Sequence, residues 1–558
     1  MFVHKTLSFF VVKILVITIC DDEGVAAPPW QRMEESMLQI KNLTITHIKD
    51  NRILLQDLSF VLNQGDKVAI IGEEGNGKSS LLKLIYDETL VEGYVEYTGE
   101  IIKNQACMGY LPQEISGEDK ALSAYEFMCK SSLFYETEPV ELAQISRKLQ
   151  LPLEMFYSEQ LVGKMSGGEK IKLQLARLMI NKPDVLLLDE PSNDLDIDTV
   201  CWLERFIQDA PIPILFISHD EVLLENTANK IIHLEQIKRK MQSRATVLKV
   251  GYREYVDQRI RSLSHQEQVA RKERSDYQKQ QEKFRKIQQK VEHQQNAISR
   301  QDPHGGALLK KTMHRVKAYE ARFEKEFENM TEIPETEDAI FIKFGDKIHV
   351  PNGKVILDYH LPELRVENDV ETAENLEKQR ILAKDIRLYI RGPEKICIIG
   401  KNGCGKTTLL RKIAEELRVR KDIKVSYMPQ NYEESLDENL TPVEFLTVTG
   451  DKEEDSRIRT YLGSMKYTPD EMNHPIRDLS GGQRAKLLLL QMSMSGSDVL
   501  ILDEPTRNFS PLSNPVIRQM LKTFGRTILS ISHDRKYIEE VADKVYELTE
   551  KGLEIKKE

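Results

Sequence analysis

Two sets of glycine, lysine and hydroxyl residues occur in this 558-residue chain at the spacing that holds nucleotide phosphates. Each set fits the pattern G-x-x-x-x-G-K-[ST], follows a short apolar run (residues 68–71 and 396–399) and precedes a helical pattern. Glycines let backbone N–H groups curve around phosphate oxygens, the lysine neutralises their charge, and the hydroxyl reaches Mg²⁺. The sets are Gly72, Gly75, Gly77, Lys78 and Ser79, and Gly400, Gly403, Gly405, Lys406 and Thr407. The sequence therefore predicts two sites for ATP and Mg²⁺.

Four further motifs follow each phosphate loop in the same order. They are a glutamine after a strand-like run, a Ser-Gly-Gly segment, an Asp-Glu pair ending an apolar run, and a histidine. These residues are Gln113, Ser166, Gly167, Gly168, Asp189, Glu190 and His219 in the first half, and Gln430, Ser480, Gly481, Gly482, Asp503, Glu504 and His533 in the second. Each residue alone would be an ordinary surface or core residue, but a fixed order that occurs twice indicates a repeated functional unit.

This order of motifs resembles the ATP-binding-cassette (ABC) superfamily, to which the Ser-Gly-Gly segment is specific. The repeat covers nearly the whole chain from about residue 37 onward. The resemblance implies an α/β fold with two P-loop ABC-type ATPase domains, or cassettes. In that superfamily each nucleotide lies between the phosphate loop of one cassette and the Ser-Gly-Gly segment of the other. Lys78 would therefore face residues 480–482, and Lys406 would face residues 166–168.

The resemblance also implies a role for each motif. Glutamates Glu190 and Glu504 would orient and polarise the attacking water. Histidines His219 and His533 would contact the γ-phosphate. The ligands of Mg²⁺ would be Ser79, Gln113 and Asp189 in one site, and Thr407, Gln430 and Asp503 in the other. Phosphoryl transfer mainly needs positioning and charge neutralisation, and these residue types supply both.

The two predicted sites differ at a position that the superfamily uses for communication between sites. Asp196 stands where the superfamily has an aspartate that communicates between sites, whereas the equivalent position in the second half is Ser510. We therefore expect the two sites to hydrolyse ATP at different rates.

Composition limits the class of protein. A length of 558 residues suits several domains, and the net charge of −10 argues against a general affinity for nucleic acid. The six cysteines show no paired or metal-ligand spacing, which is typical of a reducing cytoplasm. The apolar stretch at residues 7–20 is too short to span a bilayer and contains Lys13. We expect translation to start at Met37 or Met33, so that residues 1–36 are an untranslated or disordered leader.

A charged helical segment separates the two halves. Apolar residues recur every seven positions along its first part, which predicts a narrow coiled-coil seam. Turn residues at 302–306 interrupt the seam, and a helical spacing resumes after them. This pattern predicts an antiparallel helical hairpin. Its first arm is longer than its second, so the first arm must bend, end early or be covered by the tip. The predicted organisation is a leader (1–36), a first ABC ATPase domain (37–241), a helical linker (242–330) with its tip near 296–308, and a second ABC ATPase domain (331–558).

Two interpretations of this hairpin remain open. A charged helix is usually a solvated spacer. Residues 251–330 contain more lysine and arginine than aspartate and glutamate, and the basic residues Arg300, Lys310 and Lys311 lie at or beside the tip. Because basic side chains suit phosphates, this bias favours contact with nucleic acid.

Two fused cassettes joined by a helical hairpin, with no segment able to span a membrane, resemble the ABC-F family of translation factors. The resemblance implies a cytoplasmic, monomeric ATPase that binds large-subunit rRNA and tRNA near the exit and P sites of the ribosome. The segment between Gln113 and Ser166 leaves room for only a short inserted arm within the first cassette, and the tip of the hairpin is extended. These two features are similar to the antibiotic-resistance branch of the family, which protects ribosomes from pleuromutilin, lincosamide and streptogramin A type drugs. The alternatives are a housekeeping ABC-F factor that regulates elongation and the ATPase subunit of a drug exporter.

Overall fold

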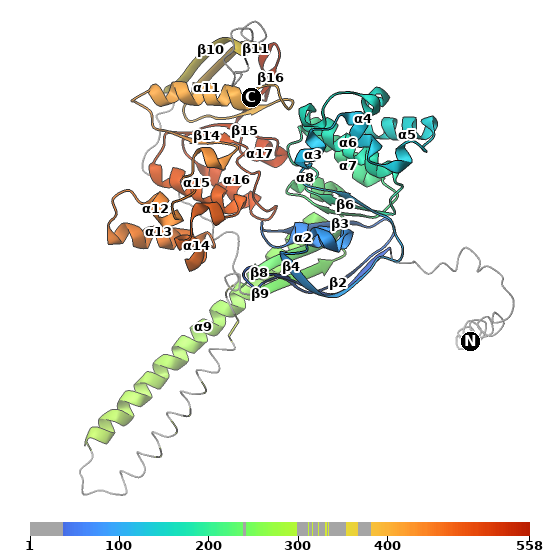
Figure 1. Cartoon of the computed structure of the whole chain (residues 1–558). Coiled ribbons are helices and arrows are strands. Elements are labelled where there is room, and N and C mark those ends of the chain that lie inside the picture. The colour runs from blue at the N-terminus through green and yellow to red at the C-terminus, as the bar shows by residue number, and fades with distance from the viewer. Residues whose placement is uncertain are drawn as a thin grey trace, which may run out of the picture.

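The computed structural model consists of two α/β units and a long projecting helix (Figure 1). It describes residues 37–237, 242–297, 353–365 and 381–557, together with residues 311, 315, 318, 322, 330, 331 and 333. The predicted leader and nearly all of the predicted linker tip lie outside these residues. In the part of the chain that is described, no helix is long and apolar enough to cross a membrane.

The first unit is built on a six-stranded sheet with the order β5-β6-β7-β3-β8-β9, in which only the β8–β9 pair is antiparallel. Its central strands are continuous apolar runs buried on both faces, as parallel strands covered by helices must be. A three-stranded antiparallel sheet, β2-β1-β4, packs beside it. The strands are β1 (Leu38–His47), β2 (Arg52–Leu62), β3 (Lys67–Gly72), β4 (Val95–Ile102), β5 (Met108–Leu111), β6 (Val185–Asp189), β7 (Ile214–Ile217), β8 (Lys230–Ile237) and β9 (Gln242–Leu248). The α-helices are α2 (Lys78–Tyr86), α3 (Gly117–Lys120), α4 (Ala124–Cys129), α5 (Pro139–Leu149), α6 (Gly167–Ile180), α7 (Ile197–Asp209) and α8 (Glu221–Thr227).

The second unit repeats this arrangement. Its six-stranded sheet has the order β13-β14-β15-β12-β16-β17, so the strand before the phosphate loop again lies at an inner position, and β10 pairs with β11 in a separate sheet. The strands are β10 (Val355–Arg365), β11 (Ile381–Arg391), β12 (Lys395–Ile399), β13 (Val425–Met428), β14 (Val499–Asp503), β15 (Thr527–Ile531), β16 (Lys544–Thr549) and β17 (Gly552–Lys557). The α-helices are α11 (Lys406–Val419), α12 (Pro442–Leu446), α13 (Lys452–Ser464), α14 (Pro469–Asn473), α15 (Gly481–Ser495), α16 (Asn514–Thr523) and α17 (Arg535–Glu540). The predicted pair of α/β domains is confirmed.

The linker begins with α9 (Tyr252–Ala297), a single helix of 46 residues that projects away from both units (Figure 1). At a rise of 1.5 Å per residue its length is roughly 70 Å. Ala270, one of the apolar residues that recur every seven positions, is fully buried, although most of its neighbours are exposed. Thr331 N–H donates to Glu273 Oε2 at 2.8 Å, so the chain returns to α9 part-way along the helix. The first arm therefore neither ends early nor breaks before Ala297.

A buried ionic cluster joins the two units. Arg518 of α16 donates to Glu221 of α8 at 2.5 Å, and the two side chains are 3% and 5% exposed. In α17, Lys536 reaches the same Glu221 at 3.1 Å, and Arg535 lies 3.2 Å from Asp220. A charged side chain that is buried away from water needs an oppositely charged or hydrogen-bonding partner. These contacts therefore hold the two units in a defined orientation.

Candidate ATP sites

Each phosphate loop connects a buried strand to a helix. The first loop leaves β3 at Gly72, where φ is +151° and an added Cβ would collide with Leu234 O, so only glycine fits. The helix begins at Lys78 in the first loop and at Lys406 in the second. Each lysine donates from Nζ to the carbonyl oxygen of the first glycine of its own loop at 2.9 Å. Burial lowers the pKa of Lys78, while nearby carboxylates oppose that shift. Both lysines are thus held inside loops shaped for phosphate.

A carboxylate and a hydroxyl meet beside each loop. Ser79 Oγ donates to Asp189 Oδ1 at 2.9 Å, and Tyr110 OH donates to Asp189 Oδ2 at 3.3 Å. Burial raises the pKa of Asp189 to about 6 against the hydrogen bond from Ser79. In the second unit, burial raises the pKa of Asp503, and a hydrogen bond from Thr407 opposes it. Asp503 Oδ2 is buried without a hydrogen-bond partner.

These oxygen atoms fit Mg²⁺. The ion prefers hard oxygen ligands and is usually held by one or two carboxylates with substrate phosphates rather than by a protein cage. Among the described residues, no group of three or more His, Cys, Asp and Glu side chains is placed to hold a metal ion. Asp189 with Ser79, and Asp503 with Thr407, could hold the ion, which would neutralise phosphate charge.

The glutamate of the first unit has two partners. Glu190 Oε1 lies 3.0 Å from His219 Nε2, and Glu190 Oε2 accepts from Asn193 Nδ2 at 2.6 Å. Burial raises the pKa of Glu190, but His219 and Lys78 outweigh it and bring the value to about 2. His219 Nδ1 also donates to Phe509 O of the second unit at 2.8 Å. This glutamate is therefore ionised, oriented and linked to the opposite unit.

The glutamate of the second unit lies in a different environment. Burial, together with the neighbouring Asp503, raises the pKa of Glu504 to about 8. His533 Nε2 lies 3.8 Å from Glu504 Oε1, and burial with the charge of Lys406 lowers the pKa of His533 to about 4. Glu504 Oε1 and His533 Nδ1 are both buried without hydrogen-bond partners. Glu504 and His533 are thus both neutral here, whereas Glu190 is ionised in the first unit.

The Ser-Gly-Gly segments (the signature segments, residues 166–168 and 480–482) begin helices α6 and α15. Ser166 caps α6, and Ser480 caps α15; each serine Oγ accepts a backbone N–H three residues later, at 3.3 Å. A Glu or Gln side chain closes both capping boxes. The backbone N–H groups at the start of each helix are therefore suited to bind an anion.

Each phosphate loop faces the signature segment of the other unit. Glu74 Oε2 in the first loop accepts from Gly482 N–H at 2.5 Å. In the second loop, Asn402 Nδ2 donates to Asp194 O beside Gly167 of the first unit. The structure therefore brings together, from opposite units, the elements that the superfamily geometry predicts to be paired.

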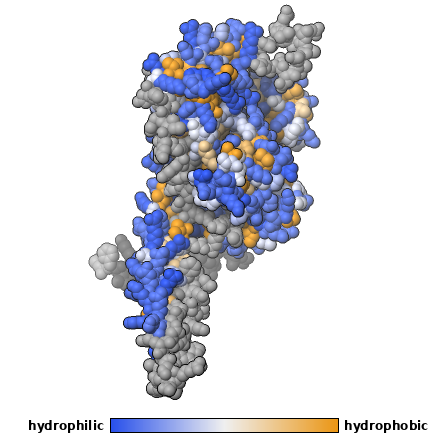
Figure 2. All heavy atoms as spheres, turned by 90° about the vertical axis from the view of Figure 1, so that its left-hand side faces the viewer, coloured by the Kyte–Doolittle hydropathy of each residue, from blue (hydrophilic) through white to orange (hydrophobic). Residues whose placement is uncertain are grey.

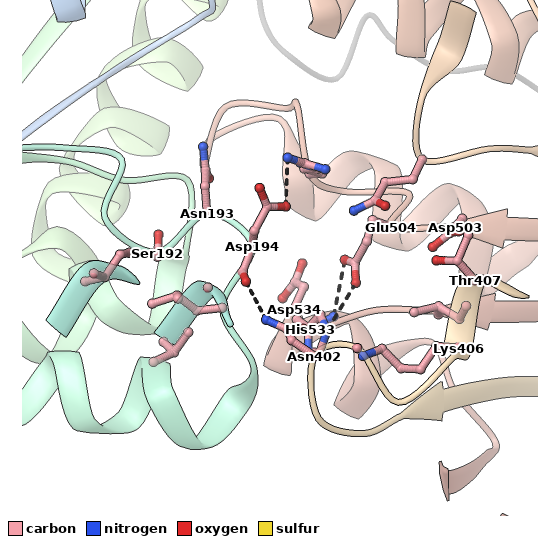
Figure 3. A pocket seen from close by; sticks show the side chains of 18 of the residues that line it. Ser192, Asn193, Asp194, Asn402, Lys406, Thr407, Asp503, Glu504, His533 and Asp534 are labelled. Atoms are coloured by element: carbon pink, nitrogen blue, oxygen red, sulfur yellow. Dashed lines mark hydrogen bonds and ion pairs between the residues drawn. The ribbon is translucent and has the colours of Figure 1, made fainter. Parts of the chain in front are cut away.

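A cavity of about 840 Å³ lies between the second phosphate loop and the first signature segment (Figure 3). Lys406, Thr407, Asp503 and Glu504 point into it from the second unit, and Ser192, Asn193 and Asp194 face them from the first. The two predicted glutamine ligands, Gln113 and Gln430, are exposed side chains on its lining. The cavity can therefore admit a nucleotide between the two units.

A family model described as ABC transporter matches residues 55–193 and 383–507, once in each unit. Each match contains a phosphate loop, a signature segment and an Asp-Glu pair. The chain contains two ABC ATPase domains. It is an ATPase, and we call the two units the first and second cassettes.

Relatives match most of the chain. The chain is 26% identical to ATP-binding protein Uup of Buchnera aphidicola and 27% identical to putative ATP-binding protein YdiF of Bacillus subtilis, over 93% of this chain and 81% of each relative. It is 25% identical to ABC transporter F family member 5 of Arabidopsis thaliana, over 90% of this chain and 73% of that protein. Its homologues therefore include ABC-F proteins.

Solved structures share the arrangement of two cassettes in one chain. The structure of the RNase-L Inhibitor has a TM-score of 0.54 at 17% identity, with 92% of this chain and 90% of that chain covered. The archaeal ribosome recycling factor aABCE1, in complex with ribosomal stalk protein aP1, has the same TM-score and identity and is covered over 89% of its chain. At this identity the similarity establishes the fold.

Sequence reasoning missed several polar residues of the ATPase sites. Glu74 and Asn402 occupy equivalent loop positions but contact the opposite cassette differently. Arg52 Nη2 donates to Gly75 O at 2.6 Å, and Arg507 pairs with Asp194 across the interface at 2.8 Å. Glu74 and Asn402 lie at variable positions of the loop motif, and the two arginines lie outside it. Spacing therefore could not indicate their contacts.

The two catalytic-position glutamates are expected to have opposite effects on the stability of the nucleotide-free ATPase. The pKa of Glu190 is lower in the folded protein than in the unfolded chain. Its ionised side chain therefore stabilises the fold above the unfolded-state pKa, and this stabilisation is lost as pH falls toward 2. The pKa of Glu504 is higher in the folded protein than in the unfolded chain. The protonated side chain therefore favours the fold, and this stabilisation is lost as pH rises from the ordinary glutamate pKa through 8. At pH 8, Glu504→Gln should therefore raise the melting temperature, and Glu190→Gln should lower it.

Thermal unfolding in EDTA without nucleotide measures both effects. The advantage of Glu504→Gln over the parent should shrink as pH is lowered to 5, where Glu504 is protonated in the folded state. The free-energy difference at pH 8 is on the order of a few kcal/mol. A Glu504→Gln protein that melts below the parent at pH 8 would contradict the assigned environment.

Proposed function

We propose that this chain is an ATP-dependent ribosome-binding protein of the ABC-F type, active in the cytoplasm as a monomer. The observation that carries the proposal is the basic arm α9, which is rooted on the strand beside the first phosphate loop. ATP binding between the cassettes would close them, and the arm would move with the first cassette. Hydrolysis would release the clamp.

The outer half of α9 has the charge expected for contact with nucleic acid. Residues 271–290 contain eight basic side chains, all exposed, against three acidic ones. The basic residues are Arg271, Lys272, Arg274, Lys279, Lys283, Arg285, Lys286 and Lys290, and the acidic residues are Glu273, Asp276 and Glu282. On the face shown in Figure 2, the described part of this projection carries mostly hydrophilic side chains. Such a surface attracts phosphate groups, whereas the chain as a whole is acidic.

The N-terminal part of α9 and the first phosphate loop both contact strand β8. Tyr255 OH hydrogen-bonds to buried His233 Nδ1 at 2.6 Å, and Arg259 pairs with Glu235 at 2.6 Å. Between these two strand residues, Leu234 O accepts a hydrogen bond from Asn76 of the phosphate loop at 2.9 Å. A rearrangement of the loop would therefore be transmitted to the arm through three adjacent strand residues.

The comparisons support the same reading. A relative that covers most of the chain is named as an F family member, and a structure of similar fold is described as a ribosome recycling factor. We infer that the partners are large-subunit rRNA and tRNA near the exit and P sites, with α9 directed toward the P-site tRNA.

We propose the following roles at the two sites. Lys78 and Lys406 bind phosphate, and the Asp189 and Asp503 carboxylates hold Mg²⁺. The side chain of Glu190 accepts the proton of the attacking water, while His219 orients it and joins it to the second cassette. Glu504 takes the same position at the other site but must first lose its proton.

Two finer functions fit this general one. The first is protection of the ribosome from drugs at the peptidyl-transferase centre, of the pleuromutilin, lincosamide and streptogramin A types. The second is a housekeeping factor that regulates elongation. Two relatives that cover most of the chain carry names that mention only ATP binding, which suits this function equally. Deleting the gene should increase sensitivity to these drugs in the first case and leave it unchanged in the second.

Sedimentation of the Glu190→Gln/Glu504→Gln variant tests the general proposal. In ATP this variant should remain closed and co-sediment with ribosomal particles, because it binds ATP but hydrolyses it slowly. The Lys78→Ala/Lys406→Ala variant lacks the phosphate-binding lysines and should stay unbound. A glutamine variant that sediments free of ribosomes, or with membranes, would show the proposal to be wrong.

A further inference from the structure

The first phosphate loop places a carboxylate on the signature segment of the second cassette. Glu74 Oε2 accepts a hydrogen bond from Gly482 N–H at 2.5 Å, at the start of the 15-residue helix α15. A Cβ on Gly481 would lie 3.2 Å and 3.3 Å from the two carboxylate oxygens of Glu74. The carboxylate therefore lies against the backbone of Gly481 and Gly482.

The neighbouring acidic residue is held by the same cassette. Glu73 Oε1 lies 3.5 Å from Lys466 Nζ and 3.9 Å from Lys486 Nζ. Two consecutive acidic side chains of the first loop are thus bound by the second cassette, one by a helix N-terminus and one by two lysines. The charge of Glu74 also acts on Lys78 within its own loop.

The second phosphate loop lacks this feature. Its equivalent residues are Lys401 and Asn402, and the Asn402 amide donates to Asp194 O of the first cassette. An amide can also donate to a phosphate oxygen, whereas a carboxylate can only accept. The two loops therefore present opposite chemistry at the same position.

We propose that Glu74 makes the first site discriminate against the triphosphate. Its carboxylate occupies the signature-segment N–H group that a γ-phosphate needs, so ATP must displace it, whereas ADP has no group at that position. This inference depends on the proposed placement of each nucleotide between a phosphate loop and the opposite signature segment. ATP consequently fills the second site before the first, and closure at the first site is the later step.

Electrostatic repulsion determines the size of the effect. A carboxylate and a phosphate a few ångströms apart repel each other strongly in a partly buried site. We expect removal of the Glu74 charge to tighten ATP binding at the first site about 10-fold or more, which corresponds to ~1.4 kcal/mol. ADP binding should change less than about two-fold, because the repelling group is absent from ADP.

Calorimetric titration of the full chain with Mg-ATP and Mg-ADP tests this inference. Glu74→Gln and Glu74→Asn are made in a Lys406→Ala background, so that binding is measured at the first site. The matched control is Asn402→Glu in a Lys78→Ala background, which should weaken ATP binding at the second site about 10-fold and spare ADP. Either first-site variant suffices if the other fails to fold.

The possible outcomes separate the inference from the functions on which it depends. Equal changes in ATP and ADP affinity would mean that Glu74 only maintains the loop, and no change would mean that it does not compete with phosphate; either result overturns the inference. Failure of the parent site to bind either nucleotide would overturn the placement of the nucleotide itself. No ribosome is present, so the ribosomal proposal is not involved.

Discussion

The Glu190→Gln/Glu504→Gln variant is expected to hydrolyse ATP at least ~10²-fold more slowly than the parent while still binding it, because loss of a positioned general base typically costs that much or more. Of the single variants, Glu190→Gln should lose more activity at pH 7. Glu190 is ionised and held by His219 and Asn193, whereas burial keeps Glu504 protonated and therefore a poor proton acceptor.

The rate of steady-state phosphate release at saturating ATP measures which of the two single variants loses more activity. Asn193→Ala removes the amide that orients Glu190 Oε2 but leaves the carboxylate, so it should cause a much smaller loss than Glu190→Gln. A larger loss in Glu504→Gln than in Glu190→Gln would contradict the difference between the two sites.

The Arg518→Met variant is expected to destabilise the contact between the cassettes. Arg518 is 3% exposed and binds Glu221, which is 5% exposed, so its removal leaves a carboxylate buried with only Lys536 to compensate. Breaking a buried pair in this way costs ~3–5 kcal/mol. We expect a lower melting temperature and reduced ATP hydrolysis, because the opposed sites depend on the orientation of the cassettes.

Two comparisons make this result specific. The Arg518→Met/Glu221→Leu variant removes both charges and should recover most of the lost stability. Arg459 pairs with Asp455 on the exposed surface of α13, so Arg459→Met should change the unfolding free energy by less than ~1 kcal/mol. If Arg518→Met and Arg459→Met melt alike, the buried cluster does not hold the cassettes together.

The paired phosphate loops and the linker could be predicted because their signals are local. Gly72 and Gly400 each follow a buried run of a few residues, and short-range chemistry dictates a strand, a loop and a helix at these places. The seven-residue period likewise predicted a long helix at α9. The predicted roles of the catalytic-position and metal-ligand residues stay predictions, although the structure brings together the aspartate and hydroxyl residue, and the glutamate and histidine, of each set.

The tertiary structure alone decided how the two sites differ. Glu190 and Glu504 occupy equivalent positions of one motif, yet one has its pKa lowered by His219 and the other has it raised by burial. Glu74 meets Gly482 far along the chain, and no periodicity encodes such a contact. Motif spacing reports the backbone path of a single cassette. Charge state and cross-cassette contact depend on what packs around each side chain, which only the assembled chain defines.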